Sequence, residues 1–237
     1  MQTMLNPNLD LAALAQAYKA RNRIQIRDLL QPIPAEDLHK VLAQTTPWKL
    51  VYYDQGNVVA LTSDELQALS PQDRAQRIAG VYSNARNNFG FIYQAFLMAE
   101  NYAERRFPGH PLHSVLEFIN SEPFLNIVRK VSGIDSITSA DGQATLYVPG
   151  HFLNSHDDKI AGHKRRVAYV LNMSKNWNPD WGGLLQFYDA EKSVDQVFVP
   201  RFNSLSLFTV PQDHAVTAVA PYAPAGRFAI TGWFVDP

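Results

Sequence analysis

The sequence predicts a mostly β fold with N-terminal helices, in which helices support a double-stranded β-helix (jelly roll) core. Apolar residues recur at helical spacing up to about residue 133 and then alternate in short runs from Ala144 onward. Short runs at roughly ten-residue spacing are typical of an antiparallel barrel or sandwich. No internal repeat or flexible linker is evident, so we expect residues 1–237 to form a single domain, with mainly helical support over 1–140 and the jelly roll over 141–237.

Helical signals dominate the first part of the chain. Acidic residues in a first turn and proline at a first helical position, as in Ser70-Pro71, mark helix starts. We expect helices in LDLAALAQAYKA, in PAEDLHKVLAQ, in the long segment 70–102 that contains FGFIYQAFLMAENY, and as a pair over 112–131 broken near Pro123. Short strands are expected over 24–27 and 48–53.

Seven alternating runs make up the second part of the chain. Glycine, aspartate and proline residues separate them as turn signals. The runs are ATLYVPGHFL, RRVAYVLNMS, GGLLQFYD, QVFVPRF, SLSLFTV, AVTAVA and RFAITGWFV. We expect them to be the strands of the jelly roll.

Composition excludes several kinds of chemistry. The chain has no cysteine, which excludes a disulfide framework, a thiolate nucleophile and an iron–sulfur cluster, so any metal must be held by histidine and carboxylate. Lys and Arg total 21 against 22 Asp and Glu, and this balance favours neither a nucleic-acid nor a membrane partner. The first 20 residues lack the features of a secretory signal and no apolar run is long enough to span a membrane, so we expect a cytoplasmic protein.

His156-Asp157-Asp158 is the first candidate for a metal site. On an extended backbone, His156 and Asp158 would point to the same face of a strand. Such a triplet is common by chance, and a loop acid beside a surface histidine is the alternative, so the pattern gains meaning only from residues further along the chain. His214 begins the run AVTAVA downstream, and Arg227 begins RFAITGWFV.

Two histidines and one carboxylate form the facial triad of non-haem Fe(II) oxygenases, which leaves three positions open on an octahedral metal. An arginine on a neighbouring strand offers a planar fork that can bind a carboxylate at two points. His156, Asp158, His214 and Arg227 together would suit a metal that chelates a dicarboxylic keto acid. Without the triad, a salt bridge at the rim would be the simpler role for Arg227.

Five ordered stretches carry a family resemblance: LYVPGHFLNSHDD, RRVAYVLNMSKNWNPDWGGLLQFY, VPRFNSLSLFTV, HAVTAV and RFAITGWF. In this order and spacing they resemble the 2-oxoglutarate and Fe(II)-dependent oxygenases of the prolyl 4-hydroxylase type, and most closely the ribosomal-protein prolyl hydroxylase branch. The stretches span residues 146–234, and the N-terminal part of the chain is similar only loosely.

The resemblance implies a role for each matching residue. His156, Asp158 and His214 would bind Fe(II), and Arg227 would bind the distal carboxylate of 2-oxoglutarate. Tyr147 stands where family members place a tyrosine that contacts this cosubstrate. Asn172 and Ala229 stand where relatives often carry a tyrosine and a small hydroxyl residue, which implies one hydrogen bond fewer to the cosubstrate. The cofactors implied are Fe(II), 2-oxoglutarate and O2, with ascorbate in a supporting role.

Other residues near the motifs have simpler interpretations. We expect Asp157 to be a solvated turn residue, and His151 and His163 to lie at the surface or around the ligands without binding metal. Trp233 is expected in the core or at its rim, and Gly182-Gly183 in a tight turn.

The resemblance favours hydroxylation of a prolyl residue in a protein or peptide. A free amino acid or another small molecule is the alternative substrate for the same chemistry. A third hypothesis is a jelly-roll protein that binds metal or ligand without catalysis, since the same three ligands could hold Zn²⁺ or Mn²⁺.

Overall fold

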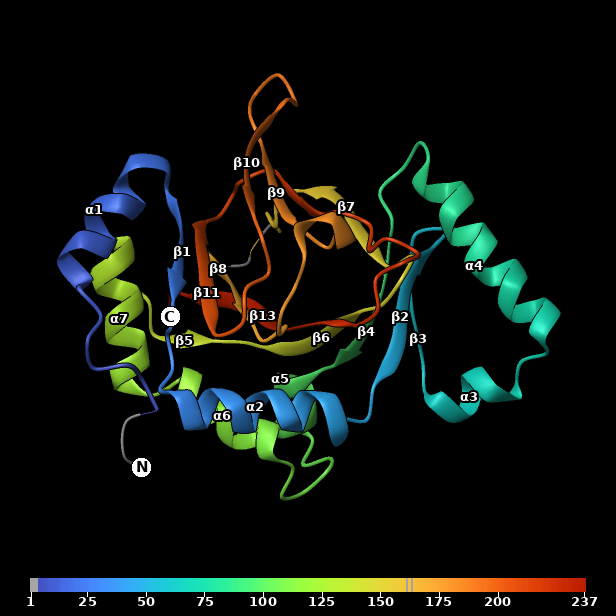
Figure 1. Ribbon diagram of the computed structural model, residues 1–237, viewed down its shortest axis with the longest axis horizontal. Coiled ribbons are helices and arrows are strands. Elements are labelled where there is room, and N and C mark those ends of the chain that lie inside the picture. The colour runs from blue at the N-terminus through green and yellow to red at the C-terminus, as the bar shows by residue number, and fades with distance from the viewer. Residues whose placement is uncertain (1–3, 161, 163) are drawn as a thin grey trace.

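The computed structural model describes residues 4–160, 162 and 164–237. Its centre is a strongly curved antiparallel sheet of the jelly-roll type, with helices packed around it (Figure 1). The strands that the structure describes are β1 (Arg23–Arg27), β2 (Lys49–Asp54), β3 (Asn57–Leu61), β4 (Phe91–Phe96), β5 (Ser139–Ala140), β6 (Gln143–Tyr147), β7 (Phe152–His156), β8 (Arg165–Asn172), β9 (Leu185–Tyr188), β10 (Val194–Phe198), β11 (Ser204–Thr209), β12 (His214–Val216) and β13 (Arg227–Val235).

Neighbouring strands of the sheet follow the order β1-β11-β8-β13-β6-β4-β7-β12-β9-β10, and the paired strands run antiparallel. β2 pairs with β4 and carries β3 on its outer side, while β5 pairs with β13. Most neighbours are not consecutive in the sequence, as expected where a jelly roll alternates between two halves. The predicted mostly β fold is therefore confirmed.

Alternation along the strands gives the barrel two faces. On β8, Val167, Tyr169 and Leu171 belong to the core shared with the helices, whereas Ala168 and Val170 belong to a separate inner cluster. Successive side chains of a strand point to opposite faces. One face of the barrel therefore packs against helices, and the other is left to line an interior.

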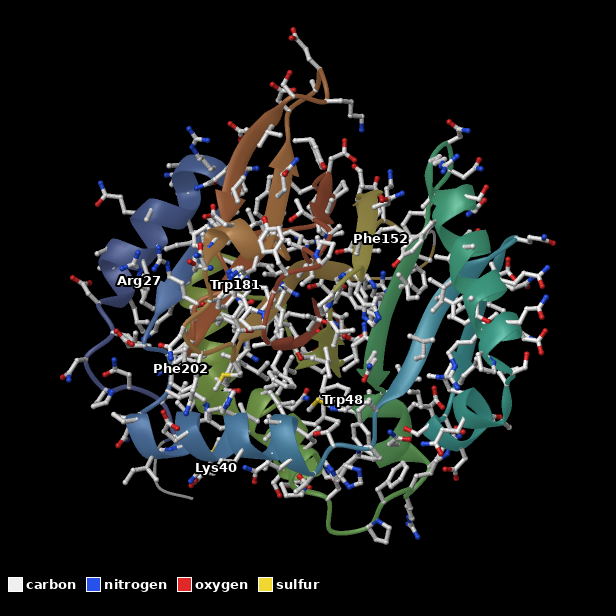
Figure 2. The ribbon with its side chains drawn as sticks, turned by 45° about the vertical axis from the view of Figure 1, so that its right-hand side comes forward. Arg27, Lys40, Trp48, Phe152, Trp181 and Phe202 are labelled. Atoms are coloured by element: carbon white, nitrogen blue, oxygen red, sulfur yellow. The ribbon has the colours of Figure 1, made fainter. Side chains whose placement is uncertain are left out.

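Helices cover the outer face. In Figure 1, α1 and α7 lie together beside β1, α2, α5 and α6 run below the barrel, and α3 and α4 lie at the opposite side, near β2. In Figure 2, Trp48 and Phe202 lie between α2 and the barrel, and Phe152 lies between β7 and α4. The helices are α1 (Leu11–Arg21), α2 (Pro32–Gln44), α3 (Ser63–Ala68), α4 (Pro71–Ala85), α5 (Met98–Ala103), α6 (Pro111–Ile119), α7 (Glu122–Ser132) and the 3-10 turn η1 (Pro179–Trp181).

Local chemistry explains where these helices begin and end. The Asp10 carboxylate accepts a hydrogen bond from the amide of Ala13 at 3.0 Å and caps α1. The Ser70 hydroxyl caps α4 in the same way, directly before Pro71 in the first turn. Gly133 ends α7 with a φ of +72°, which glycine adopts without strain. Caps therefore fix the starts of α1 and α4 and the end of α7.

The segment that contains FGFIYQAF differs from the predicted long helix over 70–102. α4 ends at Ala85, and residues 91–96 form β4, which pairs with β2, β6 and β7. The side chain of Ile92 packs towards α4, while Phe91 belongs to a different cluster with Ala95. The helical prediction was wrong because partners distant in sequence decide the conformation of an apolar, aromatic segment.

Two further details were not predicted. The run ATLYVPGHFL forms two strands, β6 and β7, separated by a turn in which Gly150 has a φ of +86°. β3 was not foreseen, and it pairs with β2 as a hairpin. Within the part of the chain that the structure describes, no helix is long and apolar enough to cross a membrane.

Candidate metal centre and its cavity

The metal-ligand candidates meet at the ends of two adjacent strands. His156 on β7 stands opposite His214 on β12 in the strand register, and their ring centres are 4.2 Å apart. The Asp158 carboxylate lies between them, with Oδ1 3.3 Å from Nε2 of His156 and Oδ2 3.5 Å from Nε2 of His214. One ligand atom from each residue lies within 4.8 Å of the others, so one ion could contact all of them.

Asp158 reaches this position by a route that the sequence did not indicate. The prediction placed His156 and Asp158 on one extended strand, but β7 ends at His156 and Asp158 has a φ of +62°. Aspartate is among the residues that tolerate the left-handed region. The exposed Asp157 accepts a hydrogen bond from the amide of Lys159 at 2.9 Å and so serves as a turn residue, as predicted.

Both histidines are oriented through their second ring nitrogen. The Nδ1 atoms of His156 and His214 lie 2.9 Å and 2.8 Å from the main-chain carbonyl oxygens of Asn154 and Gln212, respectively. A carbonyl can only accept a hydrogen bond, so Nδ1 carries a proton, and Nε2 is the atom that could contact a metal once the ring is neutral. This is the arrangement that metal-binding histidines use.

Burial and the Asp158 carboxylate have opposite effects on the pKa values of His156 and His214. Burial lowers the pKa of His214 to about 4, assisted by the charge of His156. Burial also opposes protonation of His156, but its hydrogen bond and ion pair with Asp158 outweigh this effect and raise its pKa. Burial alone would raise the pKa of Asp158, yet both imidazoles together lower it. Asp158 is thus ionised and His214 neutral near pH 7, which suits metal binding.

Arg227 lies in the interior as a cation without an anion. Its side chain is 1 % exposed, its Nε has no hydrogen-bond partner, and no carboxylate among the described residues pairs with it. Nη2 donates only a long hydrogen bond of 3.5 Å to Oδ1 of Asn172, and the guanidinium lies 5.1 Å from the Tyr147 ring centre. A buried charge normally has a partner. The site therefore fits an anionic group that would supply one.

The predicted cosubstrate residues gather around this arginine. Tyr147 on β6 stands directly opposite Arg227 on β13 in the strand register. Burial raises the pKa of Tyr147, so its hydroxyl keeps its proton and can donate a hydrogen bond. Asn172 accepts the hydrogen bond from Arg227 and is not among the residues that line the cavity. Ala229 is fully buried in the inner cluster.

A cavity of about 570 Å³ joins the metal ligands to Arg227. This volume lies in the ordinary range for ligand pockets. The inward faces of three strands form much of its wall, with residues two or four apart along each strand: Phe91 and Tyr93 on β4; Gln143, Thr145 and Tyr147 on β6; Arg227, Thr231 and Trp233 on β13.

Sequence reasoning did not find several of these wall residues. Thr145 and Thr231 could have been found by counting in steps of two from Tyr147 and Arg227. Tyr93 was missed because its segment was predicted to be helical. Trp233 was expected in the core or at its rim, and it faces the cavity, where the Arg165 guanidinium stacks 3.5 Å from its ring centre.

Gly183 makes room for Arg227. It has a φ of +63°, and an added Cβ would lie 3.0 Å from Cδ of Arg227 and 3.3 Å from the Trp177 ring. The preceding carbonyl, of Gly182, accepts a hydrogen bond from Nε1 of Trp177 at 2.9 Å. The glycine pair is therefore needed for close approach. Its predicted role was a tight turn.

Of the two other histidines near the motifs, His151 does not join the ligand group. His151 is buried, and its Nδ1 has no partner among the described residues. His163 lies outside the described residues.

Known proteins are similar to this chain over the part that contains these residues. Residues 142–235 match the family described as the 2OG-Fe(II) oxygenase superfamily. Prolyl 3-hydroxylase OGFOD1 of Mus musculus is 33% identical over 134 residues, which cover 54% of this chain and 24% of the relative. The Xenopus laevis protein of the same name is 27% identical over 126 residues, covering 50% and 24%. The chain thus spans only about a quarter of the length of these curated relatives.

Solved structures share the fold. A Pseudomonas putida prolyl-4-hydroxylase has a TM-score of 0.57 at 19% identity, over 96% of this chain and 99% of its own. A prolyl hydroxylase from Trichoplax adhaerens, in complex with a hypoxia inducible factor peptide fragment, has a TM-score of 0.62 at 20% identity, over 95% and 89%. The chain is thus similar to prolyl hydroxylase-like proteins of the 2OG-Fe(II) oxygenase superfamily, in sequence over part of its length and in fold, and the predicted resemblance is confirmed.

Proposed function

We propose that this protein is a 2-oxoglutarate and Fe(II)-dependent hydroxylase whose substrate is a prolyl residue of a protein or peptide. The observation that carries the proposal is the pairing of a three-ligand group with a buried, anion-free Arg227 across one cavity. A metal with three open positions would bind at the ligand group, and a dicarboxylic keto acid would bridge from that metal to Arg227.

In this proposal, Fe(II) would be held by Nε2 of His156, a carboxylate oxygen of Asp158 and Nε2 of His214. Bound iron would supply the oxidation chemistry, in which 2-oxoglutarate, O2 and a C–H bond of the substrate would give succinate, CO2 and a C–OH group. The chain's own residues bind and orient. Arg227 binds the distal carboxylate through its fork, and Tyr147 donates a hydrogen bond to the cosubstrate.

Asn172 has a positioning role in the proposed site. Its Oδ1 accepts a hydrogen bond from Arg227, and its own Nδ2 donates to the Val170 carbonyl at 3.4 Å. These two contacts set the direction of the guanidinium. Asn172 would therefore act on 2-oxoglutarate through Arg227, in place of the direct contact that the family resemblance implied.

The shape of the interior favours a polymer over a free amino acid. A second cavity of about 310 Å³ has Gln143, Thr231 and Trp233 in common with the first, so the two adjoin at these side chains. A peptide could occupy both parts, with residues on each side of the one that reacts. Two relatives are described as prolyl 3-hydroxylases and one neighbour was solved with a peptide, which supports a prolyl target. We place this activity in the cytoplasm, as the sequence predicts.

The test is turnover with defined substrates. The purified protein, given Fe(II), 2-oxoglutarate and ascorbate in air, is expected to form succinate and to add one oxygen atom to a proline-containing peptide, as read by mass spectrometry. Free proline in the same assay distinguishes the small-molecule alternative. Metal binding without succinate formation on any substrate would instead indicate a binding protein and contradict the proposal.

A further inference from the structure

The two ends of the curved sheet face each other without backbone pairing between them in the described structure. β1 pairs with β11 and β10 pairs with β9. Side chains bridge this seam instead. Nη1 of Arg21 lies 2.9 Å from an oxygen of Asp195, and Nε2 of Gln25 donates to the Val199 carbonyl at 2.9 Å. Between these two contacts in the sequence lies Arg23.

Arg23 is the buried member of the seam, with a side chain only 6 % exposed. Its Nε donates to Oε1 of Gln196 at 2.7 Å, its Nη1 donates to Oε1 of Gln212 at 3.0 Å, and its Nη2 pairs with Asp195. The guanidinium carbon lies 4.6 Å from the ring centre of Phe187. One rigid fork thereby joins β1 to β10 and to the connection before β12.

Gln212 links Arg23 to the metal centre. Its main-chain carbonyl is the group that accepts the hydrogen bond from Nδ1 of His214, while its side chain accepts the one from Arg23. Phe187, which lies under the guanidinium, is fully buried and has its ring centre 6.2 Å from that of His214. The same arginine therefore contacts both the residue that orients the imidazole and a ring beside it.

We propose that Arg23 is a positioning residue for His214, holding the connection before β12 so that Nε2 of the imidazole points at the metal. This inference rests on the metal centre of the proposed function. It assigns to the N-terminal strand β1, which lies outside the family-matched residues 142–235, a share in the geometry of the site. Groups that orient metal-binding histidines typically contribute about 10–100-fold to affinity, and we expect about 10-fold for Arg23.

The experiment compares metal affinity among matched variants of the full chain. Arg23→Met and Gln212→Leu break the same hydrogen bond from opposite sides, and Arg23→Lys keeps the charge without the fork. Arg21→Met is the control, because it removes an exposed arginine on the same Asp195 and leaves the Arg23–Gln212 contact in place. Binding of Co²⁺ alone is followed under anaerobic conditions by its visible absorption bands, which report the ligand geometry.

We expect all three test variants to bind Co²⁺ about 10-fold more weakly than wild type with altered bands, and Arg21→Met to match wild type. The double variant of Arg23→Met and Gln212→Leu should bind no more weakly than Arg23→Met alone, since both changes remove the same Arg23–Gln212 hydrogen bond. Wild-type affinity and bands in Gln212→Leu and Arg23→Lys would overturn the proposal, even if the variants melt earlier. If wild type itself binds no Co²⁺, the proposed function fails first.

Discussion

The two ends of the cavity are both charged and buried, but they differ in how the charge is balanced. At the ligand end, the Asp158 carboxylate is held between two imidazoles. At the other end, Arg227 has a long hydrogen bond to an amide and the face of an aromatic ring, with no carboxylate nearby in the described structure. At the ligand end the imidazoles balance the charge of Asp158, and a cation would bind there by displacing protons. At the other end the charge of Arg227 is not balanced by the described residues, so an anion would bind there.

Removing a metal ligand should have the largest effect on 2-oxoglutarate turnover. His214→Ala removes one of three ligands, so 2-oxoglutarate turnover should fall below detection, by more than the roughly 100-fold lost with an outer partner of a metal ligand. Succinate formation measures this, and circular dichroism checks that the fold is kept. Asp157→Asn, which alters the neighbouring turn carboxylate, serves as the control and should keep its turnover. Normal succinate production by His214→Ala would refute the ligand assignment.

His151, a buried histidine outside the ligand group, should make the stability of the protein depend on pH. Burial lowers the pKa of His151 to about 4, whereas an unfolded chain has the ordinary value of about 6.5. Below pH 6.5 the unfolded state binds a proton that the folded state does not, so stability is lost as the pH falls from 6.5 through 4. The loss should approach about 3 kcal/mol by the lower limit.

His151→Gln should make this part of the profile less steep, because glutamine does not titrate, while His214 continues to contribute to the slope. Urea unfolding of the metal-free protein across this pH range measures the slope. Equal slopes for wild type and variant would show that His151 is not the group responsible.

Replacing Arg227 should weaken 2-oxoglutarate binding without lowering the stability of the protein. Arg227→Met should raise the KM for 2-oxoglutarate about 100-fold, in line with the few kcal/mol that a buried charge pair contributes to binding. The metal-free protein should melt at the same or a higher temperature, because an apolar side chain replaces an unpaired buried charge. Arg166→Met, at an exposed arginine paired with Asp236, is the control with unchanged KM. A strong loss of stability with an unchanged KM in Arg227→Met would contradict this account.

The smallest expected effect concerns Tyr147. Tyr147→Phe keeps the ring under Arg227 and removes the hydroxyl, so the KM for 2-oxoglutarate should rise about 10-fold, as for one hydrogen bond to a charged group. Co²⁺ affinity in the absence of cosubstrate should not change. A KM equal to that of wild type would remove Tyr147 from the cosubstrate site.

How far the sequence could predict this molecule depends on the distance between interacting residues. His156, His214 and Arg227 lie on strands whose alternation is local, so the pattern in RFAITGWFV was sufficient to place Arg227 on a strand. β4 was mispredicted, because its pairing with β2, β6 and β7 is non-local. The left-handed conformation of Asp158 leaves no mark on a pattern of apolar residues. The contact of Arg23 with Gln212 joins residues 189 apart in the chain, beyond any local pattern.

The most direct test of the two-ended cavity is a crystal structure of the protein grown without oxygen in the presence of Mn²⁺ and 2-oxoglutarate. We predict Mn²⁺ bound by Nε2 of His156, a carboxylate oxygen of Asp158 and Nε2 of His214, with the distal carboxylate of 2-oxoglutarate on the guanidinium of Arg227. A metal bound elsewhere, or a cosubstrate carboxylate that leaves Arg227 without an anion, would contradict it.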